Sequence, residues 1–416
     1  MLTVQLFANE TTGAGVDFEA DFAAFFADFE PYSMPLFLAE GADETTQIVH
    51  LEAPTAGKES TARAVLVEGQ DFYYTFSNHS VSGTIETIRL TRLGDAYDAD
   101  TGELNYNDDG LVDTASEIIT ISGLSIYNEA GVMGDVHEVI KGFMGGGLEG
   151  TAIDAAAFSE FVWAEGHEVI GSTGNDTYAG TKYADIVRGG KGADDLKGGN
   201  GADILSGGNG SDTLSGGKGA DRLSGGNGTD TLSGGNGTDT LLGGNGADTL
   251  SGGKGADTLS GGKGTDALSG GNGTDTLSGG NGADTLSGGN GADTLSGGNG
   301  ADTLSGGKGT DTLSGGNGAD TFEFNTKAEA NGDVITDFTS TDMIDLSDID
   351  ADSTTGGNQA FTFIAESSFS GVAGELRIIE KSSKTVVAGD IDGDGSADFR
   401  ITLLDASGLD SGDFLL

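Results

Sequence analysis

An aspartate recurs at every ninth residue through the middle of this 416-residue chain, and this regular series of carboxylates is the strongest chemical feature of the sequence. Each one stands at the sixth place of a nine-residue unit, and most units read close to G-G-N-G-A-D-T-L-S. Carboxylate and main-chain carbonyl oxygens are the ligands that Ca²⁺ takes, at about 2.3–2.6 Å, so the series predicts calcium sites. Its seventeen members are Asp176, Asp185, Asp194, Asp203, Asp212, Asp221, Asp230, Asp239, Asp248, Asp257, Asp266, Asp275, Asp284, Asp293, Asp302, Asp311 and Asp320.

The other places of the unit predict how the carboxylates are held. Glycines at places one, two and four permit the positive φ angles of a tight turn and let carbonyl oxygens crowd inward. The last three residues, typically T-L-S, predict a short strand whose leucine points inward. We expect two units per coil, with each calcium ion lying between successive coils and shared by stacked aspartates. The period is typical of calcium-binding RTX β-rolls, and residues 171–323 resemble that family.

Composition limits the partners that the chain can have. The 67 acidic residues against 19 basic ones give a formal net charge of -48, which excludes nucleic acid as a partner and makes divalent cations the natural counter-charge. Without calcium we expect the repeat to be disordered, because one leucine per nine residues does not offset chain entropy. A Gly-rich flexible linker is the alternative, but a linker has no reason to keep Asp and Leu in a nine-residue register.

The sequence carries no transmembrane segment, since no run approaches 18 apolar residues, and the first residues lack the pattern of a cleavable signal peptide. There is no cysteine, so disulfides do not stabilise the chain and bound metal is an alternative device.

We predict a multidomain protein: an α+β domain at residues 1–168, a parallel β-roll (a β-solenoid) at 171–323, and a β-rich cap at 324–416. The N-terminal part is expected to hold strands at 2–7, 47–51, 62–67, 72–76, 84–93 and 117–121. Helices are expected at 16–29, 132–144 and 153–163. The cap is expected to hold strands at 333–338, 343–346, 361–365, 375–379, 385–388 and 399–404.

The cap carries a second candidate calcium site. Asp390, Asp392, Asp394 and Gly395 match the opening of an EF-hand loop, although place twelve would be Ile401 and not Glu, so a tight acidic turn is the alternative. Another acidic stretch, from Asp98 to Asp113, is read either as a solvated loop or as a calcium site.

The same cap resembles the segment that follows the repeats in serralysin-type metallopeptidases, through Asp333 to Phe338, Asp342 to Ser347 and Gly389 to Phe399. That resemblance implies an uncleaved C-terminal signal for type I secretion, and the ending Asp413-Phe414-Leu415-Leu416 fits it. It therefore also implies the type I secretion machinery as a partner and a secreted, extracellular protein.

The N-terminal domain resembles HasA-type haemophores. The stretch from Leu66 to His79 is similar to the haem-ligating strand and loop of that family, and the stretch from Asp135 to Met144 is similar to its helix beneath the haem. The resemblance implies haem as a ligand and an outer-membrane haem receptor as a partner.

Carried over by motif, Tyr74 falls on the iron-ligating tyrosine and His79 on the histidine that hydrogen-bonds it. A phenol with a pKa near 10 binds ferric iron as phenolate, and a neighbouring imidazole takes its proton. Met144 and His137 fall on the helix beneath the haem, where His137 is alternatively a core residue. The loop that supplies a second axial histidine in that family has none here, which leaves Tyr32 or Met34 as substitutes, or Tyr74 as the only ligand.

A catalytic site is not expected. His137-Glu138 is followed by Lys141, and His167-Glu168 by Gly171, where a zinc peptidase helix needs its second histidine. No G-x-S-x-G motif and no cysteine nucleophile occur. The sequence therefore predicts an extracellular, calcium-dependent haem carrier. The alternative is a structural or adhesive RTX calcium-binding protein that binds no haem.

Overall fold

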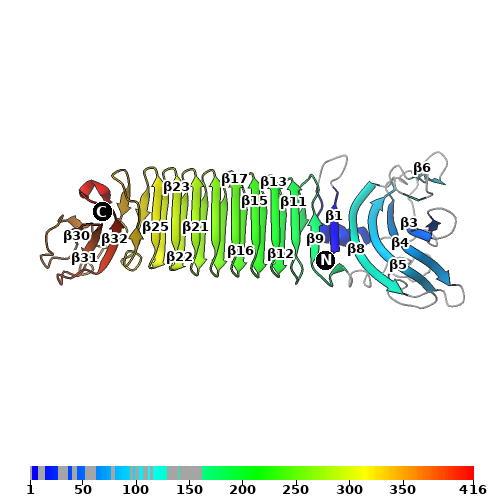
Figure 1. Cartoon of the computed structure of the whole chain (residues 1–416), viewed down its shortest axis with the longest axis horizontal. Coiled ribbons are helices and arrows are strands. Elements are labelled where there is room, and N and C mark those ends of the chain that lie inside the picture. Colours follow the sequence, from blue (N-terminus) through cyan, green and yellow to red (C-terminus); the bar gives the residue numbers. More distant parts are fainter. Residues whose placement is uncertain are drawn as a thin grey trace. The chain divides into compact units, whose positions relative to one another are not determined.

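The computed structural model describes residues 2–7, 15–26, 36–39, 45–51, 62–75, 80–93, 97–98, 103–105, 111–112, 116–128, 139 and 162–416. The chain forms two compact units, Met1–Gly199 and Asn200–Leu416, and each is described by itself. The first unit holds an antiparallel sheet with the first coils of a parallel roll, and the second holds further coils and the C-terminal cap (Figure 1).

One sheet runs through the first unit. Its antiparallel part is built, in spatial order, from β2 (Leu36–Ala39), β3 (Thr45–Leu51), β4 (Arg63–Thr75), β5 (Ser80–Arg92), β8 (Ser116–Asn128) and β1 (Leu2–Leu6). The other edge of β1 pairs in parallel with β9 (His167–Ile170), and β9 pairs with β11 (Ile186–Lys191). The first coils of the roll therefore extend the sheet of the N-terminal domain. Short strands β6 (Tyr97–Asp98) and β7 (Glu103–Leu104) pair with each other.

Helix α1 (Phe18–Phe26) follows from a local pattern. Asp17 precedes it and accepts a hydrogen bond at Oδ1 from the main-chain N–H of Ala20, 3.0 Å away, which caps the first turn. Phe18, Phe22 and Phe25 are buried, at helical spacing along one face. The expected helix at 16–29 is therefore confirmed, with a shorter span among the described residues.

The strand predictions for this domain were right in place and often too short. The two strands expected at 62–67 and 72–76 are a single strand, β4, in which the pairing shifts at Glu68/Gly69 and at Gln70/Tyr73. A Cβ on Gly69 would overlap the carbonyl oxygen of Thr84, so the missing side chain lets the strand continue through the bulge. The helices expected at 132–144 and 153–163 lie outside the described residues, except that Val139 and Val162 are helical and buried, and Trp163 follows.

The roll consists of stacked strands joined by tight turns. In the first unit its strands include β10 (Thr177–Tyr178) and β12 (Asp195–Asn200), which pair in parallel. In the second unit it comprises β13 (Ile204–Asn209), β14 (Thr213–Lys218), β15 (Arg222–Asn227), β16 (Thr231–Asn236), β17 (Thr240–Asn245), β18 (Thr249–Lys254), β19 (Thr258–Lys263), β20 (Ala267–Asn272), β21 (Thr276–Asn281), β22 (Thr285–Gly291), β23 (Thr294–Asn299), β24 (Thr303–Gly309), β25 (Thr312–Asn317) and β26 (Thr321–Glu323).

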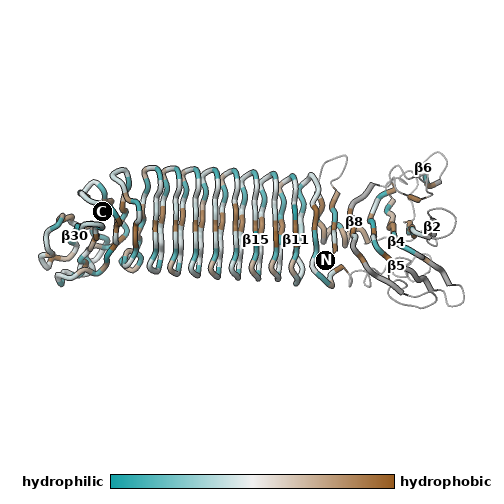
Figure 2. The backbone as a smooth tube through the Cα atoms, viewed as in Figure 1, coloured by the Kyte–Doolittle hydropathy of each residue, from teal (hydrophilic) through white to brown (hydrophobic). Residues whose placement is uncertain are grey.

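From β13 to β26, each strand of the roll pairs with the next but one. Leu223 of β15 lies beside Leu241 of β17, and Leu232 of β16 beside Leu250 of β18, both shifts of 18 residues. Two nine-residue units therefore make one coil, as the sequence predicts. Each coil contributes one leucine to each of two inward rows, which appear as hydrophobic segments at the same place on successive coils (Figure 2).

The strands of the roll are longer than expected. A T-L-S strand of three residues was predicted, but most strands have six and continue through the G-G-N of the following unit. In β16 the buried positions are Leu232 and Gly234, and their neighbours are partly or fully exposed. The first glycine of each unit is therefore a strand residue with its Cα inside the coil, and the turn begins after it.

The cap closes the roll with strands whose sequence departs from the repeat. They are β27 (Val334–Ile335), β28 (Met343–Asp345), β29 (Thr362–Phe363), β30 (Glu375–Lys381), β31 (Lys384–Asp390), β32 (Phe399–Leu404) and β33 (Phe414–Leu415), with a short 3-10 helix at Ser411–Asp413 before the last. β27 pairs with β25 and β32, and β28 pairs with β26 and β33. Both sheets of the roll thus continue into the cap. One of them ends with the C-terminal strand β33.

Leu241 and Leu242 are adjacent in β17 and point to opposite faces, which gives a matched test of the inner row. Leu241 is fully buried, whereas Leu242 is 48% exposed at a place where most units have Ser. We expect Leu241→Ala to lower the free energy of unfolding of the calcium-loaded protein by about 2–5 kcal/mol. Leu242→Ala should change it by less than about 0.5 kcal/mol. Urea unfolding followed by circular dichroism measures both, and equal effects would contradict the facing.

Candidate metal centre

The aspartates of the repeat form a ladder inside the roll, called here the aspartate ladder. From Asp203 to Asp302, the main-chain N–H of each one donates to Oδ1 of the aspartate one coil later; Asp230 N to Asp248 Oδ1, at 2.9 Å, is an example. The carboxylates are buried, with Asp239 and Asp257 each 1% exposed. The ladder therefore fixes one oxygen of each carboxylate in every coil.

From Asp221 to Asp333, the second oxygen of the ladder carboxylates is buried and has no hydrogen-bond donor. This holds, within the fully described residues 200–416, for Oδ2 of Asp221, Asp230, Asp239, Asp248, Asp257, Asp266, Asp275, Asp284, Asp293, Asp302, Asp311, Asp320 and Asp333. Buried polar atoms are almost always satisfied, and a buried ion without compensation costs several kcal/mol. Because these Oδ2 atoms stand at equivalent positions in successive units, each unit indicates the same kind of partner for its carboxylate oxygen, one that the protein's own donors do not supply.

The first glycine of the unit makes room beside these oxygens. A Cβ built on Gly243 would lie 2.5 Å from Asp248 Oδ2 and 2.7 Å from the carbonyl oxygen of Gly261, one coil later. Oxygens from two successive coils therefore converge on one point that only glycine leaves open. Gly243 does not have a positive φ, whereas Gly244 and Gly246, at places two and four, have φ of 117° and 136°. The predicted left-handed turn is right for places two and four and wrong for place one.

The electrostatics of the ladder are unfavourable without a cation. Burial, with a smaller contribution from carboxylates one coil away, raises the pKa of Asp230, Asp257, Asp266 and Asp293 to about 6. Every Lys and Arg of residues 200–323 is exposed, and none forms an ion pair with the ladder in this fully described segment. Carboxylate and carbonyl oxygens around an uncompensated negative charge are the donor set of Ca²⁺, so the residues fit that ion.

The ladder continues into the cap through residues that the repeat does not identify. Asp311 N donates to Asp333 Oδ1 at 2.8 Å, and Asp320 N donates to Asp342 Oδ1 at 3.0 Å. Both steps span 22 residues where the repeat spans 18, so a search at the nine-residue period misses them. The signal is an Asp followed by a strand, D-V-I and D-M-I, as in D-T-L. Burial raises the pKa of Asp333 to about 7.

The two ends of the ladder differ from its middle. Asp342 Oδ2 accepts hydrogen bonds from the N–H and hydroxyl of Thr339, at 2.7 and 3.0 Å. At the other end, both carboxylate oxygens of Asp176 and of Asp185 accept hydrogen bonds. Asp176 and Asp185 were predicted as calcium ligands, but both oxygens of each carboxylate already accept hydrogen bonds from the protein.

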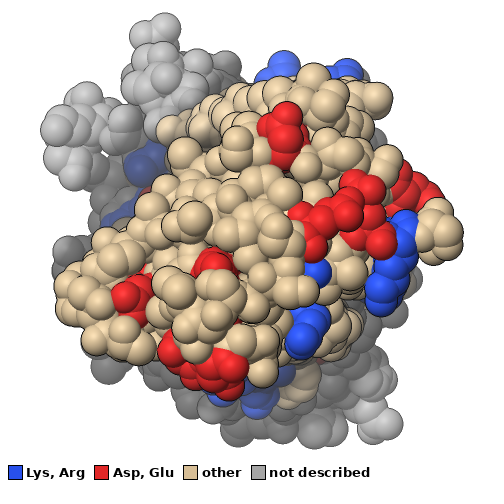
Figure 3. Space-filling model, turned by 90° about the vertical axis from the view of Figure 1, so that its left-hand side faces the viewer, with Lys and Arg blue, Asp and Glu red and all other residues tan. Residues whose placement is uncertain are grey.

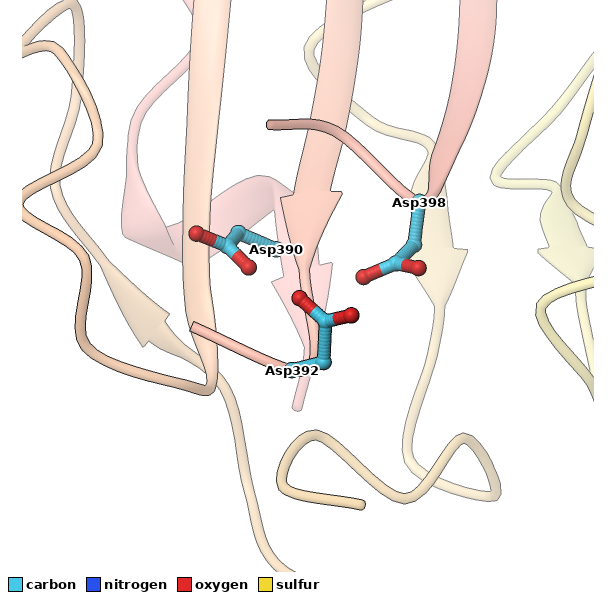
Figure 4. A group of neighbouring side chains, drawn as sticks. All are labelled: Asp390, Asp392 and Asp398. Atoms are coloured by element: carbon cyan, nitrogen blue, oxygen red, sulfur yellow. The ribbon is translucent and has the colours of Figure 1, made fainter. Parts of the chain in front are cut away.

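A second acidic group lies in the cap, where Asp390, Asp392 and Asp398 have carboxylate oxygens within 4.8 Å of one another (Figure 4). The EF-hand reading named Asp394 and not Asp398. Asp394 Oδ1 accepts instead from Ser396 N, and Asp398 is brought in because β31 and β32 pair on either side of the loop. Asp390 already accepts from Gly393 N and Gly395 N. The face at this end of the chain carries several separate groups of acidic side chains (Figure 3).

The candidate haem residues are mostly outside the described part of the chain. Tyr74 lies in β4, one residue before its end, opposite Val81 of β5. His79, Tyr32, Met34, His137 and Met144 lie outside the described residues, as does most of the acidic stretch 98–113. The structure thus describes the strand that carries Tyr74 and the hairpin it belongs to.

An isosteric substitution tests the metal role of the ladder. Asp248→Asn keeps Oδ1 as acceptor for Asp230 N but places an amide nitrogen where Oδ2 stood. We expect the loss of at least one bound Ca²⁺ and a higher calcium requirement for folding. Isothermal titration calorimetry measures the stoichiometry. The control is Asp195→Asn, an exposed acid at place seven, and equal losses in both variants would contradict the assignment.

The raised pKa values of the ladder predict a pH dependence. The pKa of Asp230 in the folded, metal-free roll is about 6, above the ordinary 3.8. Protonation of this carboxylate therefore stabilises the metal-free roll at low pH, and that stabilisation is lost as the pH rises through about 6. Ca²⁺ needs the ionised form, so protons compete with it as pH falls. For carboxylates whose coil is already stacked when the ion binds, the half-maximal calcium concentration should rise about tenfold between pH 7.5 and pH 5 for each proton displaced. Circular dichroism titrations test this, and a constant midpoint would contradict it.

Comparison with known proteins agrees with this geometry. Six overlapping matches to the model of the RTX calcium-binding nonapeptide repeat run from residue 170 to residue 322. A search of curated proteins found no match to the chain. Within the described residues, no helix has the length and apolar character needed to cross a membrane.

Several solved structures are each similar to a part of the chain. The apo haemophore HasA of Yersinia pestis is 17% identical, with 39% of this chain and 87% of that chain covered and a TM-score of 0.28. The R2 subunit of the mannuronan C5-epimerase AlgE6 of Azotobacter vinelandii is 26% identical, covering 40% and 90%, with a TM-score of 0.24. The extracellular lipase LipA of Serratia marcescens is 16% identical, covering 60% and 40%, with a TM-score of 0.20.

The nine-residue period, the ladder of buried aspartates and the family match agree. Residues 170–322 are RTX calcium-binding nonapeptide repeats folded as a parallel β-solenoid.

Proposed function

We propose that this chain is a secreted RTX protein that folds when it meets extracellular calcium and carries haem on its N-terminal domain. The observation that carries the calcium part is the row of buried Oδ2 atoms without donors. A roll that must neutralise these charges with Ca²⁺ is unstable where free calcium is scarce, as it is inside cells. Export as an unfolded chain and folding outside is the route that fits this requirement, and type I secretion is such a route.

The position of one tyrosine supports the haem part of this proposal. Tyr74 lies near the end of β4, and the connection to β5 at Ser80 contains His79. This is the strand-and-loop order by which the sequence resembles HasA-type haemophores. A tyrosinate at this position would hold ferric iron, and the imidazole of His79 would accept or share the phenol proton. Tyr32 or Met34 would supply a second iron ligand, or Tyr74 would hold the iron alone, and Met144 and His137 would contribute to the haem site.

The proposal places no catalytic step on this chain. The sequence has no cysteine, and neither His-Glu pair has the second histidine of a zinc peptidase helix. The protein would therefore act as a carrier that binds haem and passes it to an outer-membrane receptor.

Haem titration of the full chain in millimolar Ca²⁺ tests the carrier function. We expect ferric haem to bind with the visible charge-transfer band of a tyrosinate ligand. Tyr74→Phe should abolish the band and weaken binding by about tenfold or more, since it removes the iron ligand. Tyr73→Phe, in the same strand, is the control and should keep both.

Failure to bind haem in calcium would overturn the carrier function. It would leave the alternative, a structural or adhesive RTX protein, because calcium-dependent folding of the roll is measured separately by circular dichroism.

A further inference from the structure

The first two units of the repeat differ from the later ones at place two, where Ser172 and Thr181 stand in place of glycine. Later units have glycine with positive φ at this place, such as Gly244 at 117°. Neither Ser172 nor Thr181 has a positive φ. The first two turns therefore have a different backbone conformation and bring an N–H and a hydroxyl to the carboxylate of their own unit.

Hydrogen-bond donors surround the carboxylates of both units. Asp176 Oδ1 accepts from Val16 N at 2.7 Å and from Ser172 Oγ at 2.9 Å, and its Oδ2 accepts from Ser172 N at 2.6 Å. Val16 is 160 residues away in the sequence and belongs to the N-terminal domain.

Asp185 has the same environment. Its Oδ1 accepts from His167 N at 2.6 Å and from Thr181 Oγ1 at 3.1 Å, and its Oδ2 accepts from Thr181 N at 2.8 Å. Three donors to a buried carboxylate supply the stabilisation that a cation supplies elsewhere. In Asp239 or Asp257 of the later coils, by contrast, Oδ2 has no donor.

Main-chain pairing joins these units to the N-terminal domain. β1 pairs with β9 from Leu2↔His167 to Gln5↔Ile170, and Thr177 N donates to Val16 O at 2.8 Å. Asp176 N in turn donates to Asp194 Oδ1 at 2.8 Å, which starts the regular ladder. Asp176, which is held by the hydrogen bonds of its own unit, thus already donates to the aspartate of the first regular unit.

A buried aromatic group completes the junction. Phe18 of α1 packs against Trp163, His167 and Tyr178, with ring centroids 5.7, 6.0 and 6.0 Å apart. The Tyr178 hydroxyl is 2.9 Å from His167 Nδ1, and His167 Nε2 is 2.7 Å from Val162 O. Apolar burial here needs no metal and is far denser than the single leucine of each later unit.

We propose that the N-terminal domain and the first two repeat units form a calcium-independent seed on which the calcium-dependent coils assemble. Asp176 and Asp185 are then structural acceptors and not calcium ligands. The N-terminal domain thereby acts as a template for the roll in addition to any ligand it carries, and this role does not depend on haem.

Hydrogen–deuterium exchange with mass spectrometry, on the full chain in chelator and in millimolar Ca²⁺, tests the seed. In chelator we expect peptides covering 167–178 to remain protected, while those covering 200–323 exchange as an unfolded chain does. Exchange of 167–178 at the rate of 200–323 in chelator would overturn the proposal. Protection of both regions in chelator would overturn it too, because no metal-dependent part would then need a seed.

A double variant tests the donors themselves. Ser172→Ala with Thr181→Val removes only the two hydroxyls, and we expect exchange of 167–178 in chelator to accelerate about tenfold or more. Ser206→Ala with Thr213→Val, which removes hydroxyls of the same two types on regular strands, should leave 167–178 unchanged. Equal effects in the two variants would contradict the assignment.

The single tryptophan of the chain gives a second readout that needs no variant. Trp163 is a partly buried member of the aromatic group, so its emission in chelator should already be that of a partly buried indole and shift little when Ca²⁺ is added. A solvent-exposed emission in chelator that moves to the blue with calcium would refute the seed.

Discussion

The structure depends on burying a column of like charges. Each coil places carboxylates directly over those of the coil before it, at a spacing fixed by hydrogen bonds from the main-chain N–H of one aspartate to the carboxylate of the next. Such a column is unstable alone, because each charge is desolvated and faces another of the same sign. A divalent cation between the coils compensates for the lost hydration of the carboxylates and replaces their mutual repulsion with attraction to the ion. We therefore expect metal binding and folding to be one process through the middle of the roll.

The remaining features of the repeat follow from that constraint. Place one must be glycine because the carboxylate and a carbonyl oxygen converge on the point where a Cβ would stand. Places two and four must be glycine because the turn requires a left-handed backbone. The leucine rows fill the narrow interior, but with one large side chain per unit they contribute too little to offset the entropy of ordering nine residues. Stability therefore depends on what neutralises the ladder.

The ends of the ladder show two ways of neutralising a buried carboxylate. In the middle, an oxygen is left for a cation; at Asp176, Asp185 and Asp342, serine and threonine donate N–H and hydroxyl groups instead. An end rung has a neighbour on one side only, and three of the four end rungs are satisfied by such donors; Asp333, the fourth, keeps an Oδ2 without a donor. Hydrogen-bond donors from the adjoining domain or cap take the place of the missing coil. The same chain thus contains coils whose carboxylates keep an oxygen without a donor and end rungs at Asp176, Asp185 and Asp342 whose oxygens have donors.

The sequence by itself determined the period, the inward leucines, the ladder positions and the calcium chemistry, because each follows from residues inside one nine-residue unit. Tertiary structure decided what depends on distant partners. The 22-residue steps to Asp333 and Asp342 follow from strand pairing across an insertion, and Asp398 replaces Asp394 because a hairpin brings it back. The donor to Asp176 comes from Val16, in another domain. The residues of one repeat determine the conformation of its own coil. The ends of the roll depend on contacts between residues far apart in the sequence, which a nine-residue period cannot reveal.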